Sequence, residues 1–339
     1  MNRPRTPMNV LCSLLAAAFL VPLGAYEAPK TPTGGTAKNS NISTAALWTD
    51  RGDIASLNLL YGPGGKEHEP TGKFTFVSED KQGTSAKFEI VDQQGVRWKA
   101  KLGEESKSET AATRLVWAAG YFTDEDYYLP TLQVDKMRKL ERGQQFVSAD
   151  GLVTGVRLER HLSGQKKNGN WSWFKNPLSG TKELNGLKIM MALIDNWDLK
   201  EINNSIYTEK REGTRYAVSD LGASFGKTGN SLTRSKSNPG DYSASKFIQK
   251  VTAEHVDFFL NSRPFVLSVV NVPNYATRTH MQDVVKNIPL ADARWLGKLL
   301  EPLSDEQIRD CFRAAGYTPE EVEQNAAMVK ERIKDLNTL

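Results

Sequence analysis

The chain has 339 residues, of which 39% are hydrophobic and 25% are charged, a composition typical of a soluble globular protein. It excludes a wholly disordered chain and a protein embedded in a membrane over most of its length. The formal net charge is only +4. Because this charge gives no electrostatic support for nucleic-acid binding, we expect no nucleic-acid partner.

The N-terminal segment has the layout of a secretory signal peptide. Arg3 and Arg5 precede an apolar run over residues 10–20, and the small residues Gly24 and Ala25 follow it. A basic region, a short apolar region and a small-residue cleavage site are the three parts of such a signal. Residues 1–25 are therefore predicted to be a signal peptide, and the protein is predicted to be exported, either periplasmic or secreted.

The same apolar run is short, and Pro22 soon interrupts it, so we expect no stable membrane span. An uncleaved N-terminal membrane anchor is the alternative. Residues 26–45 are rich in Pro, Thr, Gly, Ser and Asn, a composition that predicts a flexible linker.

The next part of the chain, residues 46–165, combines strands with one helix. Apolar and polar residues alternate in three successive segments, which predicts an antiparallel meander over residues 74–77, 86–91 and 96–102. A helical pattern follows over residues 106–119, and alternation resumes within residues 144–162. The sequence therefore predicts a small antiparallel sheet with one helix.

Residues 166–339 are mainly helical in their pattern. A helix is predicted over residues 184–194, followed by a hairpin around Arg211–Gly213. Residues 226–243 have few apolar side chains and predict a surface loop. Ser304 and Thr318 each begin a capping box, which predicts a helix start at both positions. The fold class that follows is α+β, with a small sheet region and a larger, mainly helical region.

Two loops carry the residue types that phosphoryl transfer requires. The first runs from Asn196 to Asn203 and contains Asp198 and Lys200, and the second places Asp220 before Leu-Gly after a short strand. Asp198 is the candidate carboxylate for the acceptor hydroxyl, and Lys200 is placed to steady the transferring phosphate. Asn203 and Asp220 offer oxygen ligands, which a hard ion such as Mg²⁺ or Mn²⁺ prefers.

A nucleotide also needs a cation and a loop that covers its phosphates. Lys101, at the end of the third predicted strand, is the candidate cation, and Lys99 is its rival because side chains two residues apart lie on the same face of a strand. Glu109 on the following helix is the candidate partner of Lys101. Gly83, in the turn between the first two strands, would let backbone N–H groups approach the phosphates.

Other interpretations of these residues stay open. Asp and Asn often close turns for local backbone reasons, and Lys99 and Lys101 would equally suit an exposed strand face. Asp198 and Asp220 would also suit the paired carboxylates of an exported hydrolase. The aromatic segment 170–174 predicts core packing, with stacking on a base or sugar as the alternative. The four histidines have no zinc-ligand spacing.

At these loops the chain resembles the atypical branches of the protein-kinase-like superfamily. Residues 194–198, Ile-Asp-Asn-Trp-Asp, and residues 220–226, Asp-Leu-Gly-Ala-Ser-Phe-Gly, are similar to the Asn-x-Asp and Asp-x-Gly-x-x-Phe-Gly motifs of the secreted Golgi casein kinase family. Kinases of the HipA type and phosphatidylinositol kinases have related loops. The segment 109–121 resembles the helix of their small lobe, so that the resemblance covers roughly residues 74–226.

The resemblance implies a bilobal fold, with an N-lobe over residues 46–165 and a C-lobe over residues 166–339. It implies a catalytic role for Asp198 and metal binding by Asn203 and Asp220. It places Lys101 with Glu109 on the nucleotide, and the cofactors it implies are ATP with Mg²⁺ or Mn²⁺. The acceptor would be a hydroxyl group on a protein, a glycan or a small molecule. A kinase fold kept as a catalytically silent binding module is the main alternative.

Overall fold

A computed structural model describes residues 46–209, 213–228, 234–260 and 267–339, all within one unit, Asn41–Leu339. The predicted signal peptide (residues 1–25) and linker (residues 26–45) lie outside the described residues. Among the residues that are described, no helix has both the length and the apolar character needed to cross a membrane.

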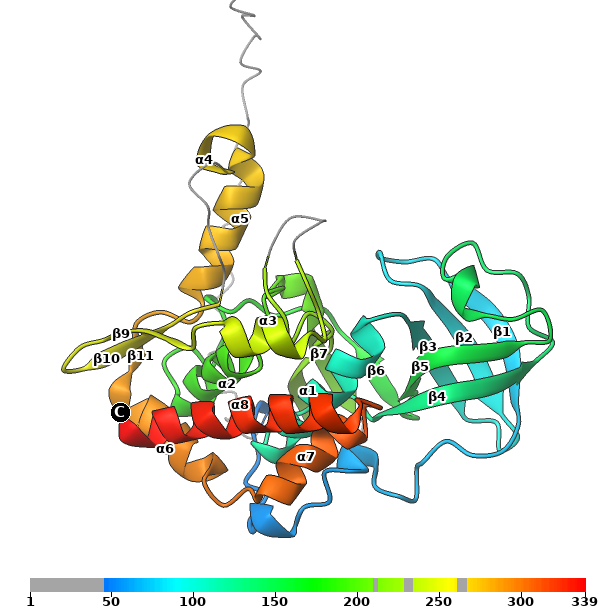
Figure 1. Ribbon diagram of the computed structural model, residues 1–339, viewed down its shortest axis with the longest axis horizontal. Coiled ribbons are helices and arrows are strands. Elements are labelled where there is room, and N and C mark those ends of the chain that lie inside the picture. Colours follow the sequence, from blue (N-terminus) through cyan, green and yellow to red (C-terminus); the bar gives the residue numbers. More distant parts are fainter. Residues whose placement is uncertain (1–45, 210–212, 229–233, 261–266) are drawn as a thin grey trace, which may run out of the picture. The chain divides into compact units, whose positions relative to one another are not determined.

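Five strands form a closed sheet in the first part of the described chain (Figure 1). Their spatial order is β1 (Phe74–Asp80), β2 (Lys87–Asp92), β3 (Arg97–Leu102), β5 (Leu152–Arg160) and β4 (Asp126–Asp135). The inward side chains of these strands form a hydrophobic cluster of their own, which includes Phe74, Phe88, Ile90, Trp98 and Leu158. The three predicted strands of the meander correspond to β1, β2 and β3.

The prediction of a purely antiparallel sheet was wrong at one pairing. The end of β4 pairs with the start of β1 in parallel, with Phe74 opposite Val134, and this pairing closes the sheet. The physical reason is the length of β4, whose ten residues extend beyond its antiparallel partner β5 and reach β1. A register irregularity between Phe76 and Ser78 in β1 accompanies this closure, as bulges often do in curved sheets.

Helix α1 (Glu105–Ala118) follows β3 and agrees with the predicted helix to within one residue at each end. Its apolar face, which includes Ala111 and Leu115, is buried in a second and larger hydrophobic cluster formed mainly by the helical part of the chain. Gly120 ends this region with φ +95°, and a Cβ there would meet the backbone oxygen of Thr49 at 2.5 Å. Glycine is therefore required at this turn.

The middle of the chain positions the two candidate loops. Thr181 caps α2 (Lys182–Leu193), which leads directly into the first loop. The predicted hairpin is present as β7 (Asn204–Glu209) and β8 (Gly213–Val218), and β6 (Gln165–Lys167) pairs with β7. Within the predicted turn, Arg211 and Glu212 lie outside the described residues.

The prediction that residues 226–243 form only a loop was wrong at its C-terminal end. Helix α3 (Pro239–Ala244) begins there, because the side chain of Asn238 accepts a hydrogen bond from the backbone N–H of Asp241 and Pro239 occupies the first helical position. Strands β9 (Ile248–Val251) and β10 (His255–Phe258) follow, and β10 also pairs with β11 (Ile288–Pro289).

Helices dominate the C-terminal third (Figure 1). They are α4 (Leu267–Val270), α5 (Val272–Asp283), α6 (Leu290–Leu300), α7 (Asp305–Arg313) and α8 (Pro319–Thr338). Both predicted capping boxes are confirmed, at Ser304 for α7 and at Thr318 for α8. Helix α7 contacts both α1 and α8, so the C-terminal helices support the helix that borders the candidate site.

Short 3₁₀ turns occur at Ile54–Ser56, Gly62–Gly64, Gln144–Phe146 and Glu201–Asn203. In the aromatic segment, Trp171 and Trp173 are buried in the larger cluster, which confirms the prediction of core packing. Phe174 remains 39% exposed.

Candidate active site

The loop that carries Asp198 is fixed by its own hydrogen bonds. The side chain of Asn196 accepts from the backbone N–H of Asp198 at 3.1 Å, and the side-chain amide of Asn203 donates to the carbonyl of Asp198 at 2.8 Å. The carboxylate of Asp198 pairs with Lys200, whose Nζ lies 2.7 Å from Oδ1. The loop therefore presents Asp198 and Lys200 as one unit, with Asn203 closing it from the C-terminal side.

Backbone hydrogen bonds join this loop to the one that carries Asp220. The N–H of Phe225 donates to the carbonyl of Ile194 at 2.9 Å, and the N–H of Ser219 donates to the carbonyl of Asn203 at 2.9 Å. Phe225 is fully buried, with its ring 5.1 Å from that of Phe312. The structure therefore brings Asn203 next to the start of the Asp220 loop, as a shared metal site would require.

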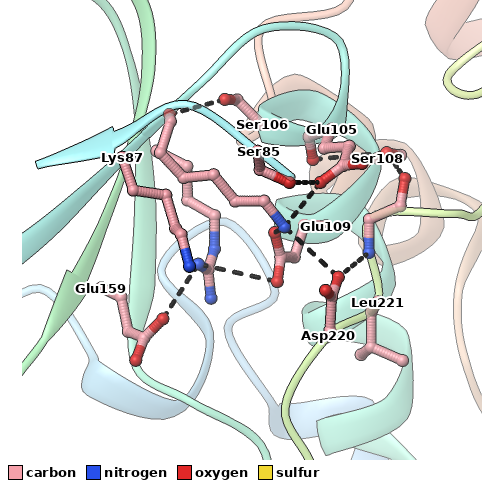
Figure 2. Close-up of polar contacts among 12 residues, drawn as sticks. Ser85, Lys87, Glu105, Ser106, Ser108, Glu109, Glu159, Asp220 and Leu221 are labelled. Atoms are coloured by element: carbon pink, nitrogen blue, oxygen red, sulfur yellow. Dashed lines mark hydrogen bonds and ion pairs between the residues drawn. The ribbon is translucent and has the colours of Figure 1, made fainter. Parts of the chain in front are cut away.

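Lys101 contacts three carboxylates at once, and these converge on it from α1 and from the second loop (Figure 2). Its Nζ lies 2.8 Å from Glu109 Oε2, 2.8 Å from Glu105 Oε2 and 3.2 Å from Asp220 Oδ1. Lys101 and Glu109 are buried, whereas the side chain of Asp220 is 43% exposed. The predicted pair of Lys101 with Glu109 is thus present, and it adjoins the predicted metal ligand Asp220.

Lys99, the rival cation, has a different partner. Its Nζ lies 3.3 Å from Glu159 Oε1, and within the described residues it forms no ion pair with Glu109 or Asp220. Glu159 is bound in turn by Arg157, whose Nη1 lies 3.1 Å from Glu159 Oε2 and 3.6 Å from Glu109 Oε1. Arg157, a residue of β5, therefore forms ion pairs both with the partner of Lys99 and with the partner of Lys101.

Burial and charge shift the pKa values in this cluster in opposite directions. Burial alone would lower the pKa of Lys101, but the carboxylates of Glu109, Asp220 and Glu105 outweigh it and raise that pKa above its usual value. Burial raises the pKa of Glu109 to about 7, against the opposing charges of Arg157 and Lys101. Lys101 is therefore held in its charged form, which is the form that binds phosphate.

The loop between β1 and β2 reaches this cluster through Ser85 and not through Gly83. Gly83 has φ +67°, and its carbonyl accepts a hydrogen bond from Arg142 Nη1 at 2.6 Å. The hydroxyl of Ser85 donates to Glu105 Oε2 at 2.8 Å. Phosphate contact by the backbone around Gly83 stays a prediction, and the contact of this loop with the charge cluster through Ser85 was not predicted from the sequence.

Several solved structures are similar to this chain, among them two kinases. One is a Helicobacter pylori proinflammatory kinase, CtkA, with 11% identity, coverage of 79% of this chain and 98% of that chain, and a TM-score of 0.46. The other is a Golgi casein kinase, with 11% identity, coverage of 84% of this chain and 78% of that chain, and a TM-score of 0.35. No protein-family model and no curated protein matches the sequence. At this level of similarity, the geometry around Lys101 has to carry any functional argument.

A cavity of about 280 Å³ lies beside Lys99. Its walls include Lys99 and Glu159 from the sheet, Asp124 from the segment before β4, and Tyr207 from β7. The hydroxyl of Tyr207 lies 3.2 Å from that of Ser219, the residue before Asp220. The cavity therefore borders the strand that carries Lys101, and its wall residue Tyr207 contacts the residue before Asp220.

Two backbone N–H groups in the wall of this cavity, those of Arg160 and His161, already have backbone partners. The backbone N–H of Arg160 donates to the carbonyl of Glu125 at 2.9 Å, and that of His161 donates to the carbonyl of Arg97 at 3.0 Å. Burial, followed by the charge of Glu159, raises the pKa of the Asp124 carboxyl well above its usual value. Any ligand in the cavity would meet a carboxyl group and an ammonium group.

Several residues of the charge cluster were not predicted from the sequence. Glu105 is the first residue of α1 and not a residue before the helix, and Arg157 is buried in β5 beneath the cluster. Arg157 also pairs through Nε with Asp126 at 2.7 Å. The sequence did contain an indication of this cluster, because Arg157 and Glu159 are two residues apart on a strand and their side chains therefore lie on the same face.

Proposed function

We propose that this chain is a kinase-like phosphotransferase of bilobal design, which binds ATP with Mg²⁺ or Mn²⁺ and transfers phosphate to a hydroxyl group. The sheet with α1 would be the N-lobe (residues 46–165), and the helical part would be the C-lobe (residues 166–339). The observation that carries the proposal is the buried ion pair of Lys101 and Glu109 in direct contact with Asp220.

The residues around the two loops fit the needs of phosphoryl transfer. Asp198 would accept the proton of the acceptor hydroxyl, and Lys200, paired with it at 2.7 Å, would steady the transferring phosphate. Asn203 and Asp220 are oxygen donors on adjoining loops, and the carboxylate of Asp220 is accessible, so this donor set fits a hard divalent ion. Such an ion would neutralise phosphate charge when bound.

The cavity beside Lys99 is the proposed site of the nucleoside. Its wall residue Lys99 lies two strand residues from Lys101, and its wall residue Tyr207 contacts Ser219, which precedes Asp220. A nucleotide with its phosphates at Lys101 would therefore place its base and sugar there. Because the N–H groups of Arg160 and His161 have backbone partners, side chains would make most of the polar contacts to the base.

The proposed setting is outside the cytoplasm, since residues 1–25 have the layout of an export signal and are followed by a flexible composition. The acceptor would be a hydroxyl on a protein, a glycan or a small molecule. A hydrolase that uses Asp198 and Asp220 as a carboxylate pair has less support, because each carboxylate has a lysine as its near partner.

Thermal denaturation of the purified protein tests nucleotide binding directly. We would titrate ATP and GTP, each with Mg²⁺ or Mn²⁺, and expect the melting temperature to rise only when nucleotide and metal are both present. A ligand at 100 times its Kd stabilises the native state by about 2.7 kcal/mol, which is a shift of several degrees. The absence of any shift in all four combinations would rule out the proposal.

A further inference from the structure

Glu105, the first residue of α1, connects three separate parts of the site. Its carboxylate accepts a hydrogen bond from Ser85 at 2.8 Å and lies 2.8 Å from Lys101 Nζ (Figure 2). Its other oxygen is paired with Lys236, from the segment that follows Asp220. The side chain of Glu105 is only 18% exposed, so these contacts form at a largely desolvated position.

Lys236 extends this connection to the loop that carries Asp198. Its side chain is 20% exposed, and its ammonium lies 5.4 Å from the ring centroid of Trp197. The indole N–H of Trp197 donates to the carbonyl of Ser235 at 3.2 Å. One lysine thus contacts α1 on one side and the residue before Asp198 on the other.

The backbone around Lys236 is anchored as well. The N–H of Ser237 donates to the carbonyl of Ser224 at 3.0 Å, and the N–H of Asn238 donates to the carbonyl of Phe225 at 2.7 Å. The position of Lys236 is therefore fixed by hydrogen bonds to the Asp220 loop, and it is not set by the Glu105 pair alone.

The charges show why Glu105 needs two cations. Although burial acts to raise the pKa of Glu105, the charges of Lys101 and Lys236 outweigh it and hold that pKa well below its usual range. A phosphate arriving at Lys101 would compete with Glu105 for the same ammonium group. Without Lys236, the carboxylate of Glu105 would then keep only the hydrogen bond from Ser85 and no cation, and a largely buried charge without an opposite charge is costly.

We propose that Lys236 is a positioning residue that retains Glu105, and with it the first turn of α1, when nucleotide phosphates replace Glu105 on Lys101. This inference rests on the proposed nucleotide binding at Lys101. Because Glu109 lies one turn further along α1 and stays on Lys101, loss of the Glu105 anchor would loosen the Lys101–Glu109 pair at the moment of binding. Lys236 would thereby couple the Asp220 loop to the nucleotide lysine.

The test compares Lys236→Ala, Lys236→Arg and the control Lys227→Ala in the full chain. Lys227 lies in the same segment and pairs with Asp241 at 2.7 Å, but it has no contact with Glu105 in the described structure and is 50% exposed. Thermal shift with ATP and Mg²⁺ gives the affinity. Hydrogen exchange of the first turn of α1, with and without nucleotide, reports whether the anchor holds.

We expect Lys236→Ala to weaken ATP binding by about tenfold, which lies in the usual range for energetic coupling between two sites of one protein. Without nucleotide, hydrogen exchange in the first turn of α1 of this variant should be close to wild type, because Lys101 and Ser85 still contact Glu105. Once ATP is bound, hydrogen exchange there should become faster than in wild type. Lys236→Arg should have the ATP affinity and the hydrogen-exchange rate of wild type, and Lys227→Ala should leave these two quantities unchanged. A purely structural role would instead change exchange equally in the two states.

The outcomes separate this inference from the proposed function. If wild type shows no nucleotide-dependent shift, the proposed function fails and the inference fails with it. If wild type binds ATP and Lys236→Ala matches it in affinity and in exchange with ATP bound, only the role of Lys236 is overturned. Faster exchange in Lys236→Ala already present without nucleotide would also overturn that role.

Discussion

Lys101→Met tests the centre of the site, and Lys99→Met is its matched control. The two lysines lie two residues apart on β3 and face the same side of the sheet, so both substitutions remove one ammonium group from one strand face. Only Lys101 contacts Glu109 and Asp220, whereas Lys99 pairs with Glu159. The two variants should therefore differ in both stability and nucleotide binding.

The structure sets the size of the expected difference. Removing one partner of a buried ion pair costs about 3–5 kcal/mol. Two features reduce this cost for Lys101→Met: Arg157 Nη1 remains 3.6 Å from Glu109, and the raised pKa of Glu109 lets it take up a proton more easily. We therefore expect the free energy of unfolding to fall by about 2–3 kcal/mol.

Lys99→Met should cost less, about 1 kcal/mol or under, because Lys99 is 29% exposed and Glu159 keeps Arg157 at 3.1 Å. Urea denaturation of both variants measures these values. In the thermal-shift titration, Lys101→Met should weaken nucleotide binding by about 10- to 100-fold, since a hydrogen bond to a charged group contributes about 1.5–3 kcal/mol. The reasoning is refuted if Lys99→Met abolishes the nucleotide-dependent shift and Lys101→Met retains it.

The remaining predictions concern the carboxylates. Glu109 has a folded-state pKa of about 7, above its ordinary 4.5, so its contribution to stability is lost as pH rises through that interval. The free energy of unfolding of Glu109→Gln, relative to that of wild type, should therefore be higher at about pH 8 than at about pH 5. The pKa of Glu105 is shifted in the opposite direction, to below 4.5, so its contribution to folding stability is lost as pH falls below that value. The loss of unfolding free energy caused by Glu105→Gln, measured by urea denaturation across pH, should therefore become smaller in acid. Asp220→Asn should change the free energy of unfolding by less than about 1 kcal/mol, because the side chain is 43% exposed. In a thermal-shift titration it should nevertheless remove most of the metal dependence of nucleotide binding. A metal dependence equal to that of wild type would contradict the assignment of Asp220 as a metal ligand. Asp198→Asn should keep nucleotide binding and lower phosphate transfer from labelled ATP by about 100-fold or more, whereas a silent binding module would show no transfer even in wild type.

Local patterns in the sequence predicted much of this fold. Strand alternation located β1, β2 and β3, and the capping boxes located the starts of α7 and α8, because these signals depend on residues close in the chain. Strand β4 was missed, since Pro130 interrupts its pattern and its partners, β5 and β1, are distant in sequence. The closure of the sheet depends on that pairing, so it was not accessible from local patterns.

The candidate site was likewise predictable from the sequence only where its residues lie close together in the chain. The alternation of side chains along β3 left two candidates for the proposed nucleotide-binding lysine, and the contact with Glu109 distinguishes Lys101 from Lys99. The roles of Glu105 and Lys236 depend on side chains that approach one another from segments more than a hundred residues apart. No spacing in the sequence marks such a contact, because either residue alone is an ordinary surface charge.

The charge balance at Lys101 has a consequence for how a nucleotide would enter. The ammonium groups of Lys101 and Lys236 and the guanidinium of Arg157 face the carboxylates of Glu105, Glu109 and Asp220, so the site carries no excess of positive charge before any phosphate arrives. A triphosphate brings further negative charge into partly desolvated surroundings, where repulsion is weakly screened. Only a divalent cation at Asp220 offsets this repulsion without removing a carboxylate. If the proposed nucleotide site is correct, we therefore predict that binding depends strictly on metal, so that free ATP binds far more weakly than ATP with Mg²⁺.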